Sequence, residues 1–205
     1  MPVTKIAVYN EKGRVGKTPL ALEIVLRLGY NYATNQNRPR TDIQTVVPEG
    51  EFLQVGPQDR FPQLDDDFPV VFDLAGELVG YEASIVSALD QTHKIVVPVV
   101  NEPDALVGTA YAIAELKSRK SITADFIVVA NMLRDHKRDL AEITAALRLQ
   151  IGNKIPIVPV RYSKAFEYQL PEQSSVAELV KRGGLYRWNF RNVCNELDHL
   201  MTFLD

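Results

Sequence analysis

The sequence contains a single cysteine, Cys194, among 205 residues. One thiol cannot form a disulfide within the chain, and it cannot supply a cysteine-rich zinc or iron–sulfur site. The three histidines, His93, His136 and His199, have no partners at the spacing of metal ligands. This pattern favours surface or helix-end roles for the histidines and excludes an iron–sulfur protein built from one chain.

Long apolar runs and an excess of charge are also missing. No apolar run approaches the ~18 residues that span a bilayer, and Met1 to Lys5 leads into an apolar segment without a secretory signal. A net charge of −3 gives no overall attraction to nucleic acid or to anionic membrane, so such binding would need a local patch. We therefore expect a cytoplasmic protein with one domain over residues 1–205.

The segment KGRVGKT, from Lys12 to Thr18, predicts a phosphate site. The apolar run at 6–9 before it favours a buried strand, and apolar residues at helical spacing from 20 to 28 favour a helix after it. Amides in such a turn and at the helix N-terminus point at one spot, where the helix dipole favours negative charge. The expected cofactor-binding residues are Gly13, Arg14, Val15, Gly16, Lys17, Thr18 and Pro19. Lys17 would contact the β- and γ-phosphates of a nucleotide, and the Thr18 hydroxyl would hold Mg²⁺.

A second motif follows at residues 70–76. The apolar run Val70 to Phe72 ends in Asp73, with Gly76 three residues later. A strand that ends in Asp beside a P-loop is the Walker B arrangement, in which the carboxylate meets Mg²⁺ directly or through water. An Asp in this position is also a common turn cap. Because it follows a P-loop, we predict that Asp73 and Thr18 form the metal site.

Together these residues resemble the deviant Walker A motif of the ParA/MinD family of ATPases, with Glu11 where a strict P-loop has glycine. The resemblance implies that Lys12 reaches across a nucleotide-dependent homodimer to the partner's nucleotide, and that Lys12, Lys17 and Asp73 form the catalytic set. It also implies that Asn131, at the end of the strand expected at 126–131, hydrogen-bonds adenine; a turn cap is the alternative role. Arg14 replaces the usual second glycine and places a bulky cation where the family packs two loops closely, which opposes such a dimer.

The polar segment 35–42 departs most from the family. Its relatives carry an Asp-x-Asp-Pro-like switch here, whose second acid orients the attacking water. Alignment on Pro39 places Gln36 and Arg38 at the acids, and alignment on the strand expected at 30–34 gives Asn35 and Asn37. Neither register supplies a carboxylate, and nothing in the spacing requires the nearby Asp42 to substitute. We therefore predict ATP binding with weak or absent hydrolysis.

Apolar strands alternating with helices predict an α/β fold, with a mostly parallel central sheet between two helical layers. Further strands are expected at 46–47, 52–55, 70–73, 94–100, 126–131 and 155–160, and helices at 82–89, about 103–116, 136–150 and 188–204. The nucleotide site would lie at the C-terminal ends of the strands. The resemblance extends to Pro159–Arg161 as an adenine wall.

The resemblance implies an Mg·ATP-binding switch in plasmid or chromosome partition, with a centromere-bound partner protein. A basic cluster near the C-terminus is compatible with non-specific DNA binding or with an ordinary solvated surface. Acidic residues on the polar side of the last helix argue against membrane insertion. Two alternatives remain: a degenerate, non-hydrolysing adaptor in plasmid stability or conjugation, and a small-molecule ligase or kinase.

Overall fold

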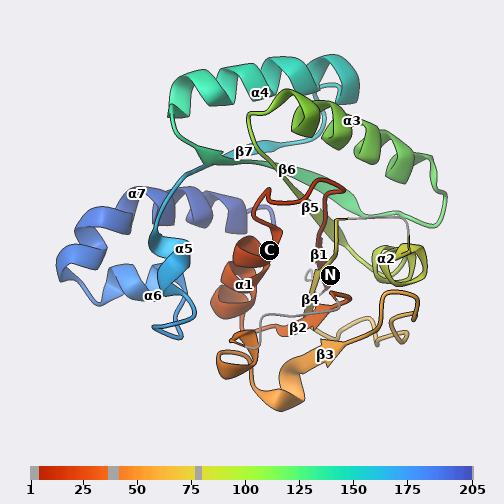
Figure 1. Ribbon diagram of the computed structural model, residues 1–205, viewed down its shortest axis with the longest axis horizontal. Helices are drawn as coiled ribbons and strands as arrows, with labels where there is room; N and C mark the ends of the chain where they lie inside the picture. Colours follow the sequence, from red (N-terminus) through yellow and green to blue (C-terminus); the bar gives the residue numbers. More distant parts are fainter. Residues whose placement is uncertain (1–4, 37–41, 77–79, 205) are drawn as a thin grey trace.

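Seven parallel strands form the centre of the molecule. The computed structural model describes residues 5–36, 42–76 and 80–204 (Figure 1). The strands form one sheet in the order β3-β2-β4-β1-β5-β6-β7, and every neighbouring pair runs parallel. They are β1 (Lys5–Val8), β2 (Asn31–Thr34), β3 (Phe52–Gln54), β4 (Val70–Asp73), β5 (Lys94–Val99), β6 (Asp125–Leu133) and β7 (Ile157–Arg161). The central strands are apolar along almost their whole length because helices cover both of their faces.

Two layers of helices enclose the sheet, as expected (Figure 1). One layer contains α1 (Lys17–Leu28), α5 (Ala165–Tyr168), α6 (Val176–Lys181) and α7 (Gly184–Met201), and the other contains α2 (Glu82–Leu89), α3 (Pro103–Ser118) and α4 (His136–Ile151). Alternate residues of β1 and of the position after it serve the two cores: Ile6 and Val8 pack with α1 and α7, whereas Ala7 and the following Tyr9 pack with α2, α3 and α4. Because successive side chains of a strand point to opposite faces of the sheet, this one short segment contributes to the cores under both helical layers.

Two segments differ from the sequence expectation. Residues 46–47 form no strand and follow a 3₁₀ turn at Ile43–Thr45, while the expected strand at 52–55 is present as β3. The last helix begins at Gly184, four residues before the expected start, and α5 and α6 precede it. The apolar pattern missed the first turn of α7 because Leu185 there is 79% exposed and does not continue the apolar stripe of the helix.

The register of the central strands brings three chain segments to one edge of the sheet. Asp73 pairs with Val8 on one side and with Thr34 on the other, so β1, β4 and β2 all end at the same level. The segments that follow β1 and β2 therefore lie beside the Asp73 carboxylate, at the edge where open α/β sheets bind ligands. No helix among the described residues is both long and apolar enough to cross a bilayer.

Candidate functional site

The loop between β1 and α1 is held in a tight form by its neighbours. Gly16 precedes α1 with φ +87°, and a Cβ there would lie 2.4 Å from Asn131 Nδ2 and 2.9 Å from Met132 Cε. Only glycine suits this position, because both the backbone angle and the space exclude a side chain. Asn131 Nδ2 donates to the Val15 carbonyl at 2.9 Å, and the buried Asn10 side chain ties the start of the loop to Pro98 and Thr109.

The first turn of α1 faces the loop without an acidic residue or a side-chain cap. Its free amides and the helix dipole therefore favour an anion. Lys17 lies in this turn, is 9% exposed, and donates from Nζ to the carbonyls of Asn10 at 3.0 Å and Lys12 at 2.9 Å. Burial lowers the pKa of Lys17, and the charge of Asp73 partly restores it. The Lys17 side chain thus bends back so that its ammonium group contacts the loop carbonyls, next to the place where phosphates would bind.

Gly76 closes the other side of the loop. A Cβ on this residue would lie 2.8 Å from the Glu11 carbonyl and 2.8 Å from Lys17 Nζ. The segment after β4 therefore packs directly against the phosphate loop, and a side chain at this position would displace the lysine. This contact brings Gly76 against the loop that the sequence predicts to bind phosphate.

Asp73 and Thr18 meet as the two motifs predict. Thr18 Oγ1 donates to Asp73 Oδ2 at 2.7 Å, and the fully buried carboxylate also accepts from Tyr32 Oη at 2.6 Å and Gln36 Nε2 at 2.9 Å. Burial raises the pKa of Asp73; the hydrogen bonds of Tyr32 and Thr18 and the charge of Lys17 oppose that rise.

The Asp73 carboxylate is only half satisfied. All three donors reach Oδ2, whereas the buried Oδ1 accepts no hydrogen bond from the described residues. A buried acceptor without a partner is costly and fits a cation or its water shell. Thr18 and Asp73 supply the hard oxygen ligands of Mg²⁺, which usually combines one or two protein groups with nucleotide phosphates. No cluster of three His, Cys, Asp or Glu side chains suited to a metal occurs in the part of the chain described.

Two adjoining cavities surround the loop. One, of about 770 Å³, lies on the phosphate side and is lined by Glu11, Arg14, Lys17, Thr18, Gln36 and Gly76, among others. The other, of about 590 Å³, is more apolar and is lined by Leu20, Asn131, Arg161, Tyr162, Phe166 and Leu170, among others. Gly16, Pro19 and Met132 line both cavities. A polar, cationic chamber beside an apolar one matches the two halves of a nucleotide.

Comparison with known proteins identifies the architecture. No protein-family model and no curated protein sequence matches the chain. Among solved structures, the ATP complex of a Cyanothece McdA variant aligns with a TM-score of 0.65 at 10% identity, over 97% of this chain and 98% of that one. MinD of Pyrococcus horikoshii OT3 complexed with Mg-ADP aligns with a TM-score of 0.60 at 15% sequence identity, over 98% of both chains. A ParA family ATPase of Chlorobium tepidum TLS gives 0.59 at 12%, over 95% of this chain and 99% of that one.

The chain has the ParA/MinD fold. The alignments with these structures include the whole sheet and both helical layers. The loop after β1 and Asp73 both lie at the C-terminal ends of the central strands. The fold recognised from the Lys12–Thr18 motif is thus confirmed. At identities of 10–15%, the likeness concerns the fold.

Within this ParA/MinD fold, Arg14 and Lys12 occupy the loop in different ways. Arg14 is exposed and has φ +63°, a left-handed conformation that favours glycine. Lys12 is half-buried; its backbone N–H donates to Asn10 Oδ1 at 3.0 Å and its carbonyl accepts from Lys17. Residue 14 thus has a backbone conformation that favours glycine, although an arginine occupies it.

The structure separates the two possible registers of the switch segment. Asn35 is fully buried: its Oδ1 accepts from the Ala75 amide and its Nδ2 donates to Ser84 Oγ, each at 2.8 Å. Gln36, by contrast, points at the Thr18–Asp73 pair and donates from Nε2 to both Asp73 Oδ2 and Thr18 Oγ1. Asn37, Arg38 and Pro39 lie outside the described residues. Asp42 lines the apolar cavity.

Several site residues were missed by sequence reasoning. Tyr32 bonds to Asp73 from the interior of β2, a contact that only the pairing of β2 with β4 creates. Tyr162 and Phe166 line the apolar cavity with Arg161, whereas Asn131 lies against the loop through its bond to Val15. Glu11, treated as a missing glycine, brings a carboxylate to the phosphate-side cavity, and burial together with the charge of Glu115 raises its pKa.

Ion pairs engage two arginines of the C-terminal basic cluster, which comprises Arg161, Lys164, Lys181, Arg182, Arg187 and Arg191. Arg161 binds Glu196 through two nitrogens, at 2.9 and 2.7 Å, and Arg182 binds Glu172 at 2.7 Å. Lys181, Arg187 and Arg191 are exposed and line one groove along α6 and α7. Trp188, at 86% exposure, adjoins the two arginines.

Proposed function

We propose that the chain is a ParA-like, Mg·ATP-binding switch protein of plasmid or chromosome partition, with weak or absent ATP hydrolysis. The observation that carries the proposal is the bonded pair of Thr18 and Asp73 beside Lys17 and a helix N-terminus without a side-chain cap. One oxygen of the Asp73 carboxylate has no partner among the described residues. Thr18 and Asp73 would hold Mg²⁺, which would supply charge neutralisation on the phosphates. Lys17 would leave the loop carbonyls for the β- and γ-phosphates.

The apolar cavity would take the nucleoside. Tyr162 and Phe166 offer apolar surface for a base, and Asn131 keeps the loop amides in place through Val15. We retain a hydrogen bond from Asn131 to adenine as part of this proposal. Lys12 would act across a nucleotide-dependent homodimer, in which the exposed Arg14 would lie at the contact between two loops.

Weak hydrolysis follows from what stands at the switch position. The second acid, which orients the attacking water in the relatives, is replaced by Arg38 in the register on Pro39 and by Asn37 in the register on the strand. Neither side chain can accept a proton from water, so we infer that general-base catalysis from this segment is lost. Glu11 is the one carboxylate among the described residues that line the phosphate-side cavity. Any residual turnover that depends on a base should therefore be lost in Glu11→Gln and persist in Asp42→Ala.

The first test is binding of ATP and ADP with Mg²⁺, compared between the wild type and Lys17→Ala. We expect binding in the wild type and a loss of at least about tenfold in the variant, since charge-assisted phosphate contacts are among the stronger polar interactions. Hydrolysis at an ordinary rate for the class, with Asp42→Ala unchanged, would contradict this interpretation of the switch. The absence of any nucleotide binding would favour the adaptor in plasmid stability or conjugation, to which Arg14 and the neutral Gln36 also point.

Partners are tested by molecular size and DNA retention with ATP, with ADP and without nucleotide. The proposal expects a dimer with ATP and salt-sensitive, non-specific DNA binding through the exposed cations of α6 and α7. Arg187→Glu with Arg191→Glu should abolish retention without changing nucleotide affinity. A centromere-bound partner protein and a cytoplasmic location without membrane attachment complete the proposal.

A further inference from the structure

Gln36 occupies an unusual place for a neutral side chain. Its amide nitrogen lies 2.9 Å from Asp73 Oδ2 and 3.2 Å from Thr18 Oγ1, which are themselves 2.7 Å apart. These three atoms form a compact triangle beside the loop. Adjacent ligands of an octahedral Mg²⁺, at 2.0–2.1 Å from the ion, are separated by about 2.9 Å, so the triangle has the size of one octahedral face.

The amide can present either of its two atoms to this triangle. A half-turn of the terminal amide exchanges nitrogen and oxygen, which would place Oε1 where Nε2 lies. With nitrogen inward, Gln36 donates to the Thr18–Asp73 pair in the absence of a cation. With oxygen inward, it offers a hard neutral ligand to the cation, of the kind that Mg²⁺ and Ca²⁺ accept.

The backbone supports this side chain from two sides. The backbone N–H of Gln36 donates to Thr34 Oγ1 at 3.2 Å, and the backbone carbonyl of Gln36 accepts from Gln54 Nε2 at 3.1 Å. Thr34 Oγ1 in turn donates to the Asp73 carbonyl at 2.9 Å. Gln36 is thus fixed to the ends of β2, β3 and β4, and only its terminal amide needs to turn.

We propose that Gln36 is a third protein ligand of the metal, whose amide turns from donating to Thr18 and Asp73 to binding Mg²⁺ through Oε1. This inference rests on the proposed function, since the metal enters with a nucleotide. Gln36 is a neutral ligand, so among these three ligands only Asp73 contributes a negative charge. Affinity for the metal then depends more strongly on the nucleotide phosphates, and Mg²⁺ should bind weakly to the protein alone.

The test measures Mg²⁺ affinity separately from nucleotide affinity. A fluorescent N-methylanthraniloyl-ADP is bound to the protein in EDTA, and Mg²⁺ is then titrated into the complex for the wild type, Gln36→Ala and Gln36→Glu. We expect Gln36→Ala to weaken Mg²⁺ by about tenfold, as losses around metal ligands do, while the affinity for nucleotide in EDTA stays within about twofold. Gln36→Glu, which keeps the shape and adds a charge, should bind Mg²⁺ more tightly than the wild type.

Gln54→Ala is the matched control, because it removes a contact to the Gln36 backbone and leaves the side-chain amide in place. It should titrate Mg²⁺ like the wild type. Unchanged Mg²⁺ affinity in Gln36→Ala, or equal losses with and without metal, would overturn the ligand role while leaving nucleotide binding intact. Should Gln36→Ala fail to fold, weaker Mg²⁺ binding by Gln36→Glu would overturn it. A wild type that binds no nucleotide would refute the proposed function and this ligand with it.

Discussion

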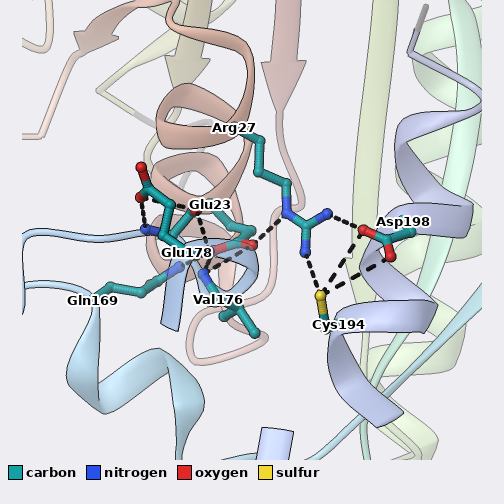
Figure 2. A network of polar contacts seen from close by, with 8 residues as sticks. Glu23, Arg27, Gln169, Val176, Glu178, Cys194 and Asp198 are labelled. Atoms are coloured by element: carbon teal, nitrogen blue, oxygen red, sulfur yellow. Dashed lines mark hydrogen bonds and ion pairs between the residues drawn. The ribbon is translucent and has the colours of Figure 1, made fainter. Parts of the chain in front are cut away.

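A buried acid anchors the C-terminal half of α1, and its removal provides the sharpest stability test. Glu23 is fully buried, yet its carboxylate accepts from Gln169 Nε2 at 2.7 Å, from the Val176 amide at 2.9 Å and from Arg27 Nε at 2.5 Å (Figure 2). Figure 2 shows Arg27 continuing from Glu23 to Asp198 and Cys194 on α7. One side chain therefore joins the helix that follows the phosphate loop to the start of α6 and, through Arg27, to α7.

The expected loss in the free energy of unfolding follows from the groups that Glu23→Ala would leave without a partner. Burial alone would lower the pKa of Arg27, but the charge and hydrogen bond of Glu23 keep it above its usual value. Without that partner a buried guanidinium remains, and among the described residues the acid left to balance it is Asp198, whose side chain is 57% exposed. Breaking a buried ion pair on one side costs about 3–5 kcal/mol, whereas an exposed pair contributes about 0–1 kcal/mol. We expect the former value for Glu23→Ala and the latter for Asp198→Asn.

Urea unfolding followed by circular dichroism measures both values. The double variant Glu23→Leu with Arg27→Met replaces the pair by apolar groups and should recover much of the loss, because buried pairs often contribute little against well-packed apolar residues. A loss below about 1 kcal/mol in Glu23→Ala would refute the reasoning, since that is the range of a solvated pair. Equal losses in Glu23→Ala and Asp198→Asn would refute it as well.

Three further predictions concern the site itself. Gly16→Ala should destabilise the protein by about 2 kcal/mol or more, because its Cβ meets Asn131 at 2.4 Å with φ +87°; thermal unfolding checks this, and adding Asn131→Ala should restore part of the loss. Arg14→Gly should be neutral or stabilising by up to about 1 kcal/mol in the same assay, because it relieves a left-handed backbone. For Asp73→Asn the prediction concerns pH. Since burial raises the folded-state pKa of Asp73, its contribution to stability is present below its unfolded value and is lost as pH rises through the folded value. Urea unfolding should therefore show the asparagine variant gaining stability relative to the wild type between pH 4 and pH 7, and a constant difference would contradict the shift.

Much of the fold could be predicted because its signals are local. Each central strand is an apolar run, and the first helix carries both a regular apolar stripe and a C-terminal glycine, Gly29, with φ +66°. Thr18 and Asp73 were paired from the sequence because parallel strands deliver their ends to one edge, and the register of Val8 with Asp73 confirms that reasoning.

What could not be predicted depends on contacts between distant segments. Tyr32 resembles an ordinary strand aromatic in the sequence, and only the β2–β4 pairing reveals its bond to Asp73. The choice between Asn35 and Gln36 turned on which side chain faces the sheet edge, a matter of one residue in register. The first turn of α7 escaped notice because its apolar residues point outward.

The departures from the family pattern act together on the charge of the site. Gln36 removes a negative charge beside Asp73, and Arg14 adds a positive charge at the mouth of the phosphate-side cavity. Glu11 opposes this trend with a carboxylate that lines the same cavity. Both substitutions favour holding a polyanion, and the loss of the switch acids removes the group that would activate water. If the proposed function holds, such a site would retain its nucleotide better than it cleaves it, and the state of the switch would follow nucleotide occupancy and release rather than turnover.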